Sequence, residues 1–391
     1  MTSWPISTLG QVATLNRLSL SRDWPFKYLK YLDISSVGEG MITSAPLSLA
    51  LGAAPSRARR LLGKGDTVLS TVRPNRRAMV FANHPDPDLV VSTGFCVITP
   101  HVSKIDPRFL FYCVFSNEFT DYLVSREKGA AYPAVTSDDV SLAPIPLPPL
   151  ETQRAIAAML GALDDKIESN RRAQNLAENL LRALVERALQ ESSGISGTLS
   201  DYCELVKDQV ATRAIDPSDN YIGFDSMPRG QIFLDQWQVA ASLASHKSRF
   251  RAGDVLFGKL RPYFKKVGIA PISGICSTDI LALRPVSPED TALVAVIASS
   301  DRLIDRLSAA ATGTRMPRAS WADLAVWPVP ILAPRERREL GQMTQPIVER
   351  ATQLTHETVM LSRLRNALLP ELLSGRARTA STVSQELEVG A

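Results

Sequence analysis

Short apolar runs broken by glycine, proline and aspartate mark the first part of the chain and return in its second half. The runs "VLSTV", "LVVST" and "FCVIT" lie within residues 68–99, and "VLFGKL" and "ILALRP" lie within 255–285. Runs of this length between turn residues are typical of β-strands. Apolar spacing favours a short helix over 107–119 and another over 293–307. This mixture of short strands and helices predicts α/β globular domains rather than all-β barrels.

Two longer stretches have the three-to-four spacing of a helical seam, over roughly 35–40 residues each. Each follows a proline-rich segment, "APIPLPPLE" or "WPVPILAPRE". At about 1.5 Å per residue such a helix is ~50–60 Å long, more than a domain core needs. A stripe of this length needs a partner, and the other long helix is the obvious one. The seam residues are Ile156, Leu160, Leu163, Ile167, Leu181 and Leu184 in the first stretch and Leu340, Ile347, Leu354, Leu361 and Leu368 in the second.

The middle of the first seam is polar, with Asn170 and Gln174. Buried amides at such positions fix the register of coiled coils. Pro346 lies inside the second seam and should kink or locally unwind that helix, because proline removes a donor and clashes with the preceding turn. In an alternative interpretation, both are ordinary amphipathic helices, each folded onto its own domain.

The two halves of the chain are copies of one unit. The stretch "GDTVLSTVRP" at 65–74 returns as "GDVLFGKLRP" at 253–262, which is 188 positions later. Motifs upstream match at an offset of 190 and motifs downstream at 184. This drift is typical of surface loops that gain or lose residues. A period of about 190 residues is too long for a solenoid, so each copy should be a domain of its own.

These patterns predict five segments along the chain. A first globular domain occupies 1–150 and a long helix 151–190, a second globular domain occupies 191–333 and a second long helix 334–375, and a flexible tail occupies 376–391. A two-fold relation between the copies demands that the helices pack antiparallel. The predicted architecture is therefore a pair of α/β globules at opposite ends of a coiled-coil spacer.

Composition excludes some classes of protein. A chain of 391 residues has room for two or three domains, and its apolar and charged fractions, 45% and 21%, are those of soluble globular proteins. No uninterrupted apolar stretch approaches the ~18–20 residues of a membrane span, and the N-terminus lacks the features of a signal peptide. Four scattered cysteines without CxxC spacing fit reduced, buried thiols in the cytoplasm. They are Cys96, Cys113, Cys203 and Cys276.

The net charge of +4 hides two basic clusters at equivalent positions of the copies. Residues 57–77 hold seven lysines and arginines against one aspartate, and residues 245–266 hold the same numbers. The remainder of the chain carries a net charge of −8. One such cluster by itself is most often a solvated face. Two clusters at equivalent positions favour a footprint for nucleic acid.

The chain lacks the motifs of several catalytic classes. "PLPPLE" has two prolines without the flanking residues of an adenine-methyltransferase loop, and there is no glycine-rich phosphate loop. None of the four histidines has a second ligand at metal spacing. The aspartates of "HPDPDLVV" fit hydrogen bonds in a turn better than Mg²⁺ ligation. A binding protein is therefore favoured over an enzyme, and trace nuclease or methylase activity of the isolated chain would revive the enzyme interpretation.

Four stretches carry a resemblance to a known family: "GDVLFGKLRPYFKKVG", "GTRMPRAS", the hinge "PIPLPPLETQRAIAAMLGALDDKI" and "LLPELLSGR". With them, nearly the whole chain resembles the specificity subunits of type I restriction–modification systems. The first copy departs from the pattern at "STVRPNRRA" and "GAAYPAVTS". The resemblance implies a DNA-reading subunit that has no catalysis of its own and binds double-stranded DNA, two methyltransferase subunits and restriction subunits. It implies no cofactor in this chain, with S-adenosylmethionine, and ATP and Mg²⁺ for cleavage, on the partner subunits.

Candidate DNA contacts follow from the basic clusters and from the resemblance. Arginine suits bidentate contacts with guanine edges and phosphates. Arg73 and Arg261 have a structural alternative, in which each caps the turn before its proline. Because the copies differ in sequence, the target should consist of two different half-sites. The length of the coiled-coil spacer formed by the two long helices should set the distance between them. The candidates are Arg73, Asn75, Arg76, Arg77, Lys128 and Tyr132 in the first copy and Lys259, Arg261, Tyr263, Lys265, Lys266, Arg315 and Arg318 in the second.

A tandem nucleic-acid-binding adaptor outside restriction–modification, for RNA for example, is the alternative function. Such a protein would lack a methyltransferase neighbour in its operon. The target itself is not readable from the sequence, because base readout depends on the direction of side chains in the groove.

Overall fold

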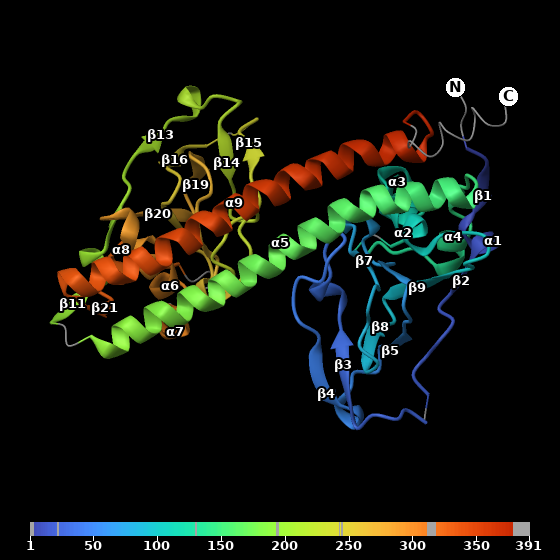
Figure 1. Cartoon of the computed structure of the whole chain (residues 1–391), viewed down its shortest axis with the longest axis horizontal. Coiled ribbons are helices and arrows are strands. Elements are labelled where there is room, and N and C mark those ends of the chain that lie inside the picture. The colour runs from blue at the N-terminus through green and yellow to red at the C-terminus, as the bar shows by residue number, and fades with distance from the viewer. Residues whose placement is uncertain are drawn as a thin grey trace. The chain divides into compact units, whose positions relative to one another are not determined.

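The computed structural model describes residues 4–21, 23–129, 131–192, 195–241, 243, 245–310 and 318–377. The chain forms two compact units. The first consists of Met1–Asp164 and Leu364–Ala391, and the second of Asp165–Arg363. Each unit therefore takes one part of each long helix, and the two units are described separately (Figure 1). The tail expected at 376–391 lies outside the described residues from residue 378 onward.

Among its described residues, the first unit contains two four-stranded sheets, a two-stranded ribbon and four short α-helices. One sheet has the order β2 (Ala13–Leu15), β9 (Phe95–Pro100), β6 (Thr67–Ser70), β7 (Met79–Phe81), and the other has the order β4 (Leu47–Ala50), β3 (Tyr28–Leu32), β8 (Leu89–Ser92), β5 (Ala58–Leu61). The ribbon pairs β1 (Ile6–Thr8) with β10 (Pro144–Pro146). The helices are α1 (Leu9–Val12), α2 (Pro107–Phe115), α3 (Asn117–Val124) and α4 (Ser137–Ser141).

The second unit repeats this plan. Its first sheet has the order β12 (Cys203–Leu205), β20 (Ile280–Pro285), β17 (Val255–Gly258), β18 (Val267–Ile269). Its second has the order β13 (Gln209–Val210), β16 (Lys247–Phe250), β19 (Gly274–Ser277), β14 (Asn220–Ile222), β15 (Gln238–Val239). The ribbon pairs β11 (Ser196–Thr198) with β21 (Pro328–Pro330), and the helices are α6 (Thr291–Ala298), α7 (Asp301–Ala310) and α8 (Trp321–Ala325).

Strand pairing confirms the sequence repeat. β1 and β10 pair Ile6 with Pro146, whereas β11 and β21 pair Ser196 with Pro330. The equivalent partners are 190 and 184 positions apart, which are the two outer offsets of the repeat. The parallel pairing of β3 with β8 returns as β14 with β19. Both copies thus have the same mixed α/β fold, as predicted.

The helices expected over 107–119 and 293–307 are each two helices. Ser116 separates α2 from α3, because its hydroxyl oxygen accepts the N–H of Phe119 at 3.1 Å and starts a new helix. In the second unit α6 ends at Ala298 and α7 begins at Asp301. Spacing of apolar residues does not reveal such a break, because buried apolar residues lie on both sides of it.

The two long helices are α5 (Leu150–Glu191) and α9 (Pro334–Leu373), close to the predicted bounds. α9 continues through Pro346 without interruption, so the predicted local unwinding is wrong. Pro346 is exposed. On that side of a helix, water can bond the carbonyl that loses its donor, which lowers the cost of the proline.

Both long helices enter the cores of the globules. In the first unit, Ile156 and Leu160 of α5 and Leu372 of α9 belong to the same apolar cluster as Phe109 of α2. In the second unit, the cluster includes Leu181 and Val185 of α5 together with Leu340 and Ala351 of α9. The apolar seams therefore pack on globular cores as well as on each other.

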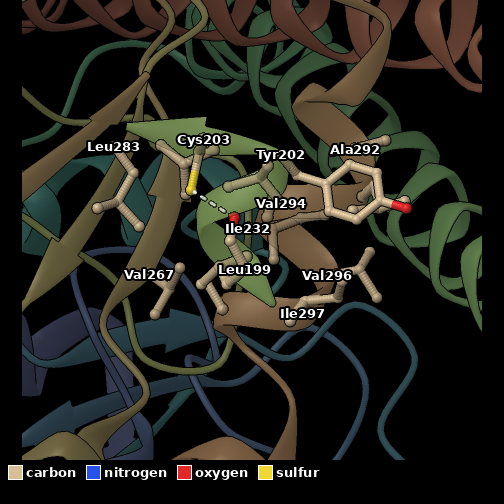
Figure 2. Packing of buried hydrophobic residues seen from close by; sticks show 14 of the residues in the cluster. Leu199, Tyr202, Cys203, Ile232, Val267, Leu283, Ala292, Val294, Val296 and Ile297 are labelled. Carbon is tan, nitrogen blue, oxygen red and sulfur yellow. Dashed lines mark hydrogen bonds between the residues drawn. The ribbon is translucent and has the colours of Figure 1, made fainter. Parts of the chain in front are cut away.

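Figure 2 shows part of the core of the second unit, where residues of the sheet and of α6 come together. Cys203 of β12 and Leu283 of β20 face this cluster, and Val294 enters it from α6. The Cys203 thiol donates to the Leu199 carbonyl at 3.6 Å. All four cysteines are free and buried, as expected, and burial raises the pKa of Cys203 to about 12.

Candidate nucleic-acid interface

The Arg-Pro sequence of each copy forms the same strained turn. Arg73 has φ 51° and ψ 62°, and Arg261 has φ 49° and ψ 68°, which is left-handed backbone. One turn of 3-10 helix follows each of them, at Pro74–Arg76 and at Pro262–Phe264. The α-helical region is disfavoured before proline, and the left-handed region costs an L-residue about 1 kcal/mol or more. We call these turns the Arg-Pro loops, residues 71–78 and 259–266.

Each Arg-Pro loop also ends in left-handed backbone. Arg77 has φ 52° and Lys265 has φ 50°. Among the described residues, five non-glycine residues have a positive φ, and four of them lie in these two loops. Strain of this kind persists where the surrounding structure holds it, and it gathers at functional sites. The repeated strain therefore marks the loops as candidate sites.

The Gly-Asp pair before each loop has a structural role. Gly65 and Gly253 have φ 87° and 88°, and the carboxylate that follows closes a turn. Asp66 accepts the N–H of Gly63 at 2.8 Å, and Asp254 accepts the N–H of Arg251 at 2.8 Å. Burial raises the pKa of Asp66. These turns lead into β6 and β17, the strands that carry the chain to the Arg-Pro loops.

In the first unit a second loop supports the Arg-Pro loop. The backbone N–H of Arg73 donates to the Pro133 carbonyl at 2.7 Å, and its guanidinium donates to the Ala131 carbonyl at 3.3 Å. The guanidinium also lies over the Tyr132 ring, 5.2 Å from its centre. Tyr132 is 73% exposed and Lys128 is exposed as well. The two loops together form one cationic and aromatic surface.

Within that surface the candidate side chains differ in freedom. Asn75 and Arg76 are exposed at the tip of the loop. Arg77 is 16% exposed, and its guanidinium bonds inside the unit. It donates to Glu39 at 2.7 Å, to Asn117 at 2.8 Å and, at a shorter distance, to the Phe115 carbonyl. A DNA contact by Arg77 would require these bonds to break, so its geometry favours a supporting role.

In the second unit, the aromatic residues Tyr263 and Phe264 stand where the first loop has Asn75 and Arg76. Tyr263 is 52% exposed, and its ring meets the Phe264 ring edge to face at 4.8 Å. Arg261 is exposed, with its guanidinium carbon 5.8 Å from the centre of the Phe264 ring. Lys265 forms an ion pair with Asp301 at the start of α7.

Lys266 is buried, with 8% of its surface exposed. Its ammonium donates to the Phe224 carbonyl at 2.6 Å and lies 4.3 Å from the centre of the Phe224 ring. Burial lowers its pKa. The predicted contact between Lys266 and DNA therefore needs a correction, because its charge holds two loops together below the surface.

The remaining candidates of the second unit flank its loop. The carbonyl of Lys259 accepts the N–H of Ala319 at 3.0 Å, which brings the half-buried Lys259 beside Arg318. Arg318 is exposed and lies 3.5 Å from the Asp279 carboxylate. Arg315 lies outside the described residues.

The two basic clusters are smaller at the surface than in the sequence. Lys247, like Lys266, is buried, and its ammonium donates to the Ser245 carbonyl at 2.8 Å. Arg60 is half-buried in β5. Exposed cations remain at each Arg-Pro loop, and these carry the electrostatic argument.

The polar middle of α5 has partners on α9. Gln174 is 8% exposed and donates to the Ala351 carbonyl at 3.1 Å and to the Thr355 hydroxyl at 2.6 Å. Asn170, 2% exposed, donates to Glu357 at 3.0 Å. Rising numbers on α5 meet falling numbers on α9, so these segments of the second unit run antiparallel.

The seam residues fall into two groups by exposure. The first group is buried and comprises Ile156, Leu160, Ile167, Leu181, Leu340 and Leu354. The second is half-buried and comprises Leu163, Leu184, Ile347, Leu361 and Leu368.

In the part of the chain that the structure describes, no group of three or more His, Cys, Asp and Glu residues could hold a metal ion. No described helix is both long and apolar enough to cross a membrane.

Residues 1–179 match the family model described as "Type I restriction modification DNA specificity domain". Over these residues, the chain is similar to the specificity domains of type I restriction–modification systems. The family match includes the first Arg-Pro loop and most of α5.

Specificity subunits are among the proteins that are similar to this chain. The HindI specificity subunit of Haemophilus influenzae is 35% identical over 132 residues, which are 33% of this chain and 29% of that protein. The MjaIX specificity subunit of Methanocaldococcus jannaschii is 21% identical over 352 residues, 82% of this chain and 79% of that protein. The S subunit of the type I restriction–modification system from M. genitalium has a similar fold, with a TM-score of 0.56, 13% identity and coverage of 95% and 99%.

Proposed function

We propose that this chain is the DNA-recognition subunit of a type I restriction–modification complex. Specificity subunits of these systems are non-catalytic. The observation that carries the proposal is the strained Arg-Pro loop, which stands at the same place in both copies with exposed cations around it. Two repeat-related reading surfaces suit a target with two half-sites.

The target should be asymmetric because the two surfaces differ. Asn75 and Arg76 stand at the tip of the first loop, where the second loop has Tyr263 and Phe264. Asparagine and arginine suit adenine and guanine edges, whereas aromatic rings suit stacking and apolar contact. One chain therefore reads two different half-sites of double-stranded DNA.

Partners supply the chemistry in this proposal. Two methyltransferase subunits would bring S-adenosylmethionine, and restriction subunits would bring ATP and Mg²⁺ for cleavage. The long helices are the proposed spacer between the half-sites and the docking surface for the methyltransferases. We place the complex in the cytoplasm, where its DNA is found and where thiols such as Cys203 stay reduced.

A binding titration tests the proposal. The full chain is mixed with a random pool of 60-base-pair duplexes, and the dissociation constant is measured at several salt concentrations. We expect the affinity to fall steeply with salt, because phosphate contacts release counterions. A matched RNA duplex and a single-stranded pool serve as controls. Preference for either control over duplex DNA would overturn the proposal in favour of an RNA-binding adaptor.

A further inference from the structure

A third loop lies against the Arg-Pro loop of the second unit. It follows β14 and spans residues 223–230. The N–H of Gly230 donates to the Lys265 carbonyl at 3.1 Å. At the other end of the loop, the buried Lys266 ammonium donates to the Phe224 carbonyl at 2.6 Å. These bonds fix the 223–230 loop beside the proposed DNA surface, although the sequences are far apart in the chain.

Arg229 projects from this loop onto the aromatic pair. Its guanidinium carbon lies 3.9 Å from the centre of the Phe264 ring, which also meets the Tyr263 ring edge to face. Arg229 is exposed. Among the described residues, no hydrogen bond or ion pair of its guanidinium is seen. A guanidinium that is held by a cation–π contact rather than by hydrogen bonds keeps its N–H donors for a ligand.

The first unit has the opposite charge at this position. Glu39 stands 190 positions before Arg229, the offset that relates the copies there. Its carboxylate accepts from Arg77 at 2.7 Å. At this position of the repeat, the first unit therefore has an ion pair between Glu39 and Arg77, and the second unit has Arg229 on the ring of Phe264. A purely structural role would not call for this inversion of charge.

From this geometry we infer that Arg229 is a DNA-contacting residue of the second unit and one source of the difference between the half-sites. The inference rests on the proposed function. A fork of N–H donors recognises a pair of adjacent acceptors. Duplex DNA offers such pairs at O6 and N7 of guanine and on phosphate oxygens.

The test compares Arg229→Ala with the wild type in binding to two duplexes. One duplex carries the target, which sequencing of methylated bases in the source strain defines first, and the other carries a scrambled sequence. We expect about a tenfold loss of affinity for the target. Arg335→Ala is the matched control, because Arg335 is an exposed arginine of the same unit whose partner is Glu339, one helical turn away on α9. The control should bind as the wild type does.

Two further measurements distinguish whether Arg229 contacts a guanine edge or a phosphate group. If Arg229 reads guanine, the loss is confined to the target, and 7-deazaguanine in the second half-site weakens wild-type binding by the same factor. If it contacts phosphate, the loss is equal on both duplexes and the salt slope falls by about one. Arg229→Glu, which installs the residue of the first unit, should lose more than Arg229→Ala in either case.

The stacking argument has its own check in Phe264→Leu, which keeps an apolar side chain and removes the ring. If the ring positions Arg229, the double variant of Arg229 and Phe264 binds no worse than Arg229→Ala alone. Unchanged affinity of Arg229→Ala and Arg229→Glu for both duplexes, with the wild type binding normally, would overturn the inference. Absence of duplex binding by the wild type would instead overturn the proposed function.

Discussion

Arg73 and Arg261 adopt the same left-handed backbone conformation, with φ and ψ of 51° and 62° in one and 49° and 68° in the other. Each is followed by a proline and by one turn of 3-10 helix. Neither side chain makes a capping hydrogen bond to the 3-10 turn that follows it. A strained conformation that appears twice suggests that the position of the loop matters more than its stability.

This strain gives a first prediction. The Arg73→Gly variant should be more stable than the Arg73→Ala variant, with a free energy of unfolding higher by about 0.5–1 kcal/mol, because glycine adopts positive φ without the steric cost that alanine bears. Both variants lose the side chain, so both should bind duplex DNA more weakly than the wild type. Denaturant unfolding and a binding titration measure the two effects. Equal unfolding free energies for the two variants would show that the loop carries no strain.

Neighbouring arginines of the first loop should respond differently to truncation. Arg77→Ala should lower the free energy of unfolding by about 2–4 kcal/mol, because it removes bonds to Glu39, Asn117 and the Phe115 carbonyl. Arg76→Ala should leave that energy within about 0.5 kcal/mol, since Arg76 is exposed.

For DNA binding, the order of the two variants should be the opposite: Arg76→Ala should have the larger effect and Arg77→Ala the smaller one. Arg76→Ala should weaken binding and reduce the salt slope by about one, as expected when one phosphate contact is lost. The two variants control for each other, since both remove the same kind of side chain from adjacent positions. Loss of stability in Arg76→Ala would remove Arg76 from the contact set and give it a structural role.

A buried ion pair of the second unit gives a third prediction. The Asp254 side chain is 3% exposed, and Arg284 donates to it from two nitrogens at 2.9 and 2.8 Å. Arg284→Leu should lower the free energy of unfolding by about 2–4 kcal/mol, because it strands a buried carboxylate. Adding Asp254→Asn should recover part of that loss. Additive losses in the double variant would mean that the pair is not coupled.

The long helices give a fourth prediction, which concerns the spacing of the half-sites. Gln174 contacts Thr355 across the helices. Seven residues inserted after Gln174 and after Thr358 keep the heptads of the two seams in register, although Gln174 and Thr355 then move apart. Each added heptad lengthens an antiparallel rod by about 10 Å, or roughly three base pairs. Twist of the DNA takes up part of this change. A methylated target with both half-sites and one to three extra spacer pairs is expected.

Insertion in the first helix alone should abolish methylation, since it puts the two seams out of register. Full activity of the double insertion on the original spacer would contradict the spacer role and leave the helices as a docking surface.

The parts of this molecule that could be predicted from the sequence are those with a repeating pattern of residues. The alternation of apolar runs with turns located β6, β9, β17 and β20, and the offsets of 190 and 184 returned as the registers of the two ribbons. Seam spacing located α5 and α9 nearly to their ends.

The contacts of individual side chains cannot be predicted from periodicity in the sequence. Arg77 and Lys266 look like surface cations in a basic run, yet their partners lie about 40 residues away in sequence, at Glu39 and Phe224. Arg229 is not predictable from the sequence for the same reason, because nothing in its neighbourhood indicates that it lies on the Phe264 ring. Its one sequence signal is the charge opposite to Glu39 at the equivalent position of the other copy.

The most direct measurement of the central claim is the map of methylated bases in the genome of the source strain, with and without the gene for this chain. The account predicts that one methylated motif disappears on deletion, that it consists of two different half-sites separated by an unspecified spacer, and that the gene restores it. Complementation with Arg76→Ala should affect only one half-site and Arg261→Ala only the other. An unchanged map after deletion, or a single continuous motif altered throughout by both variants, would contradict it.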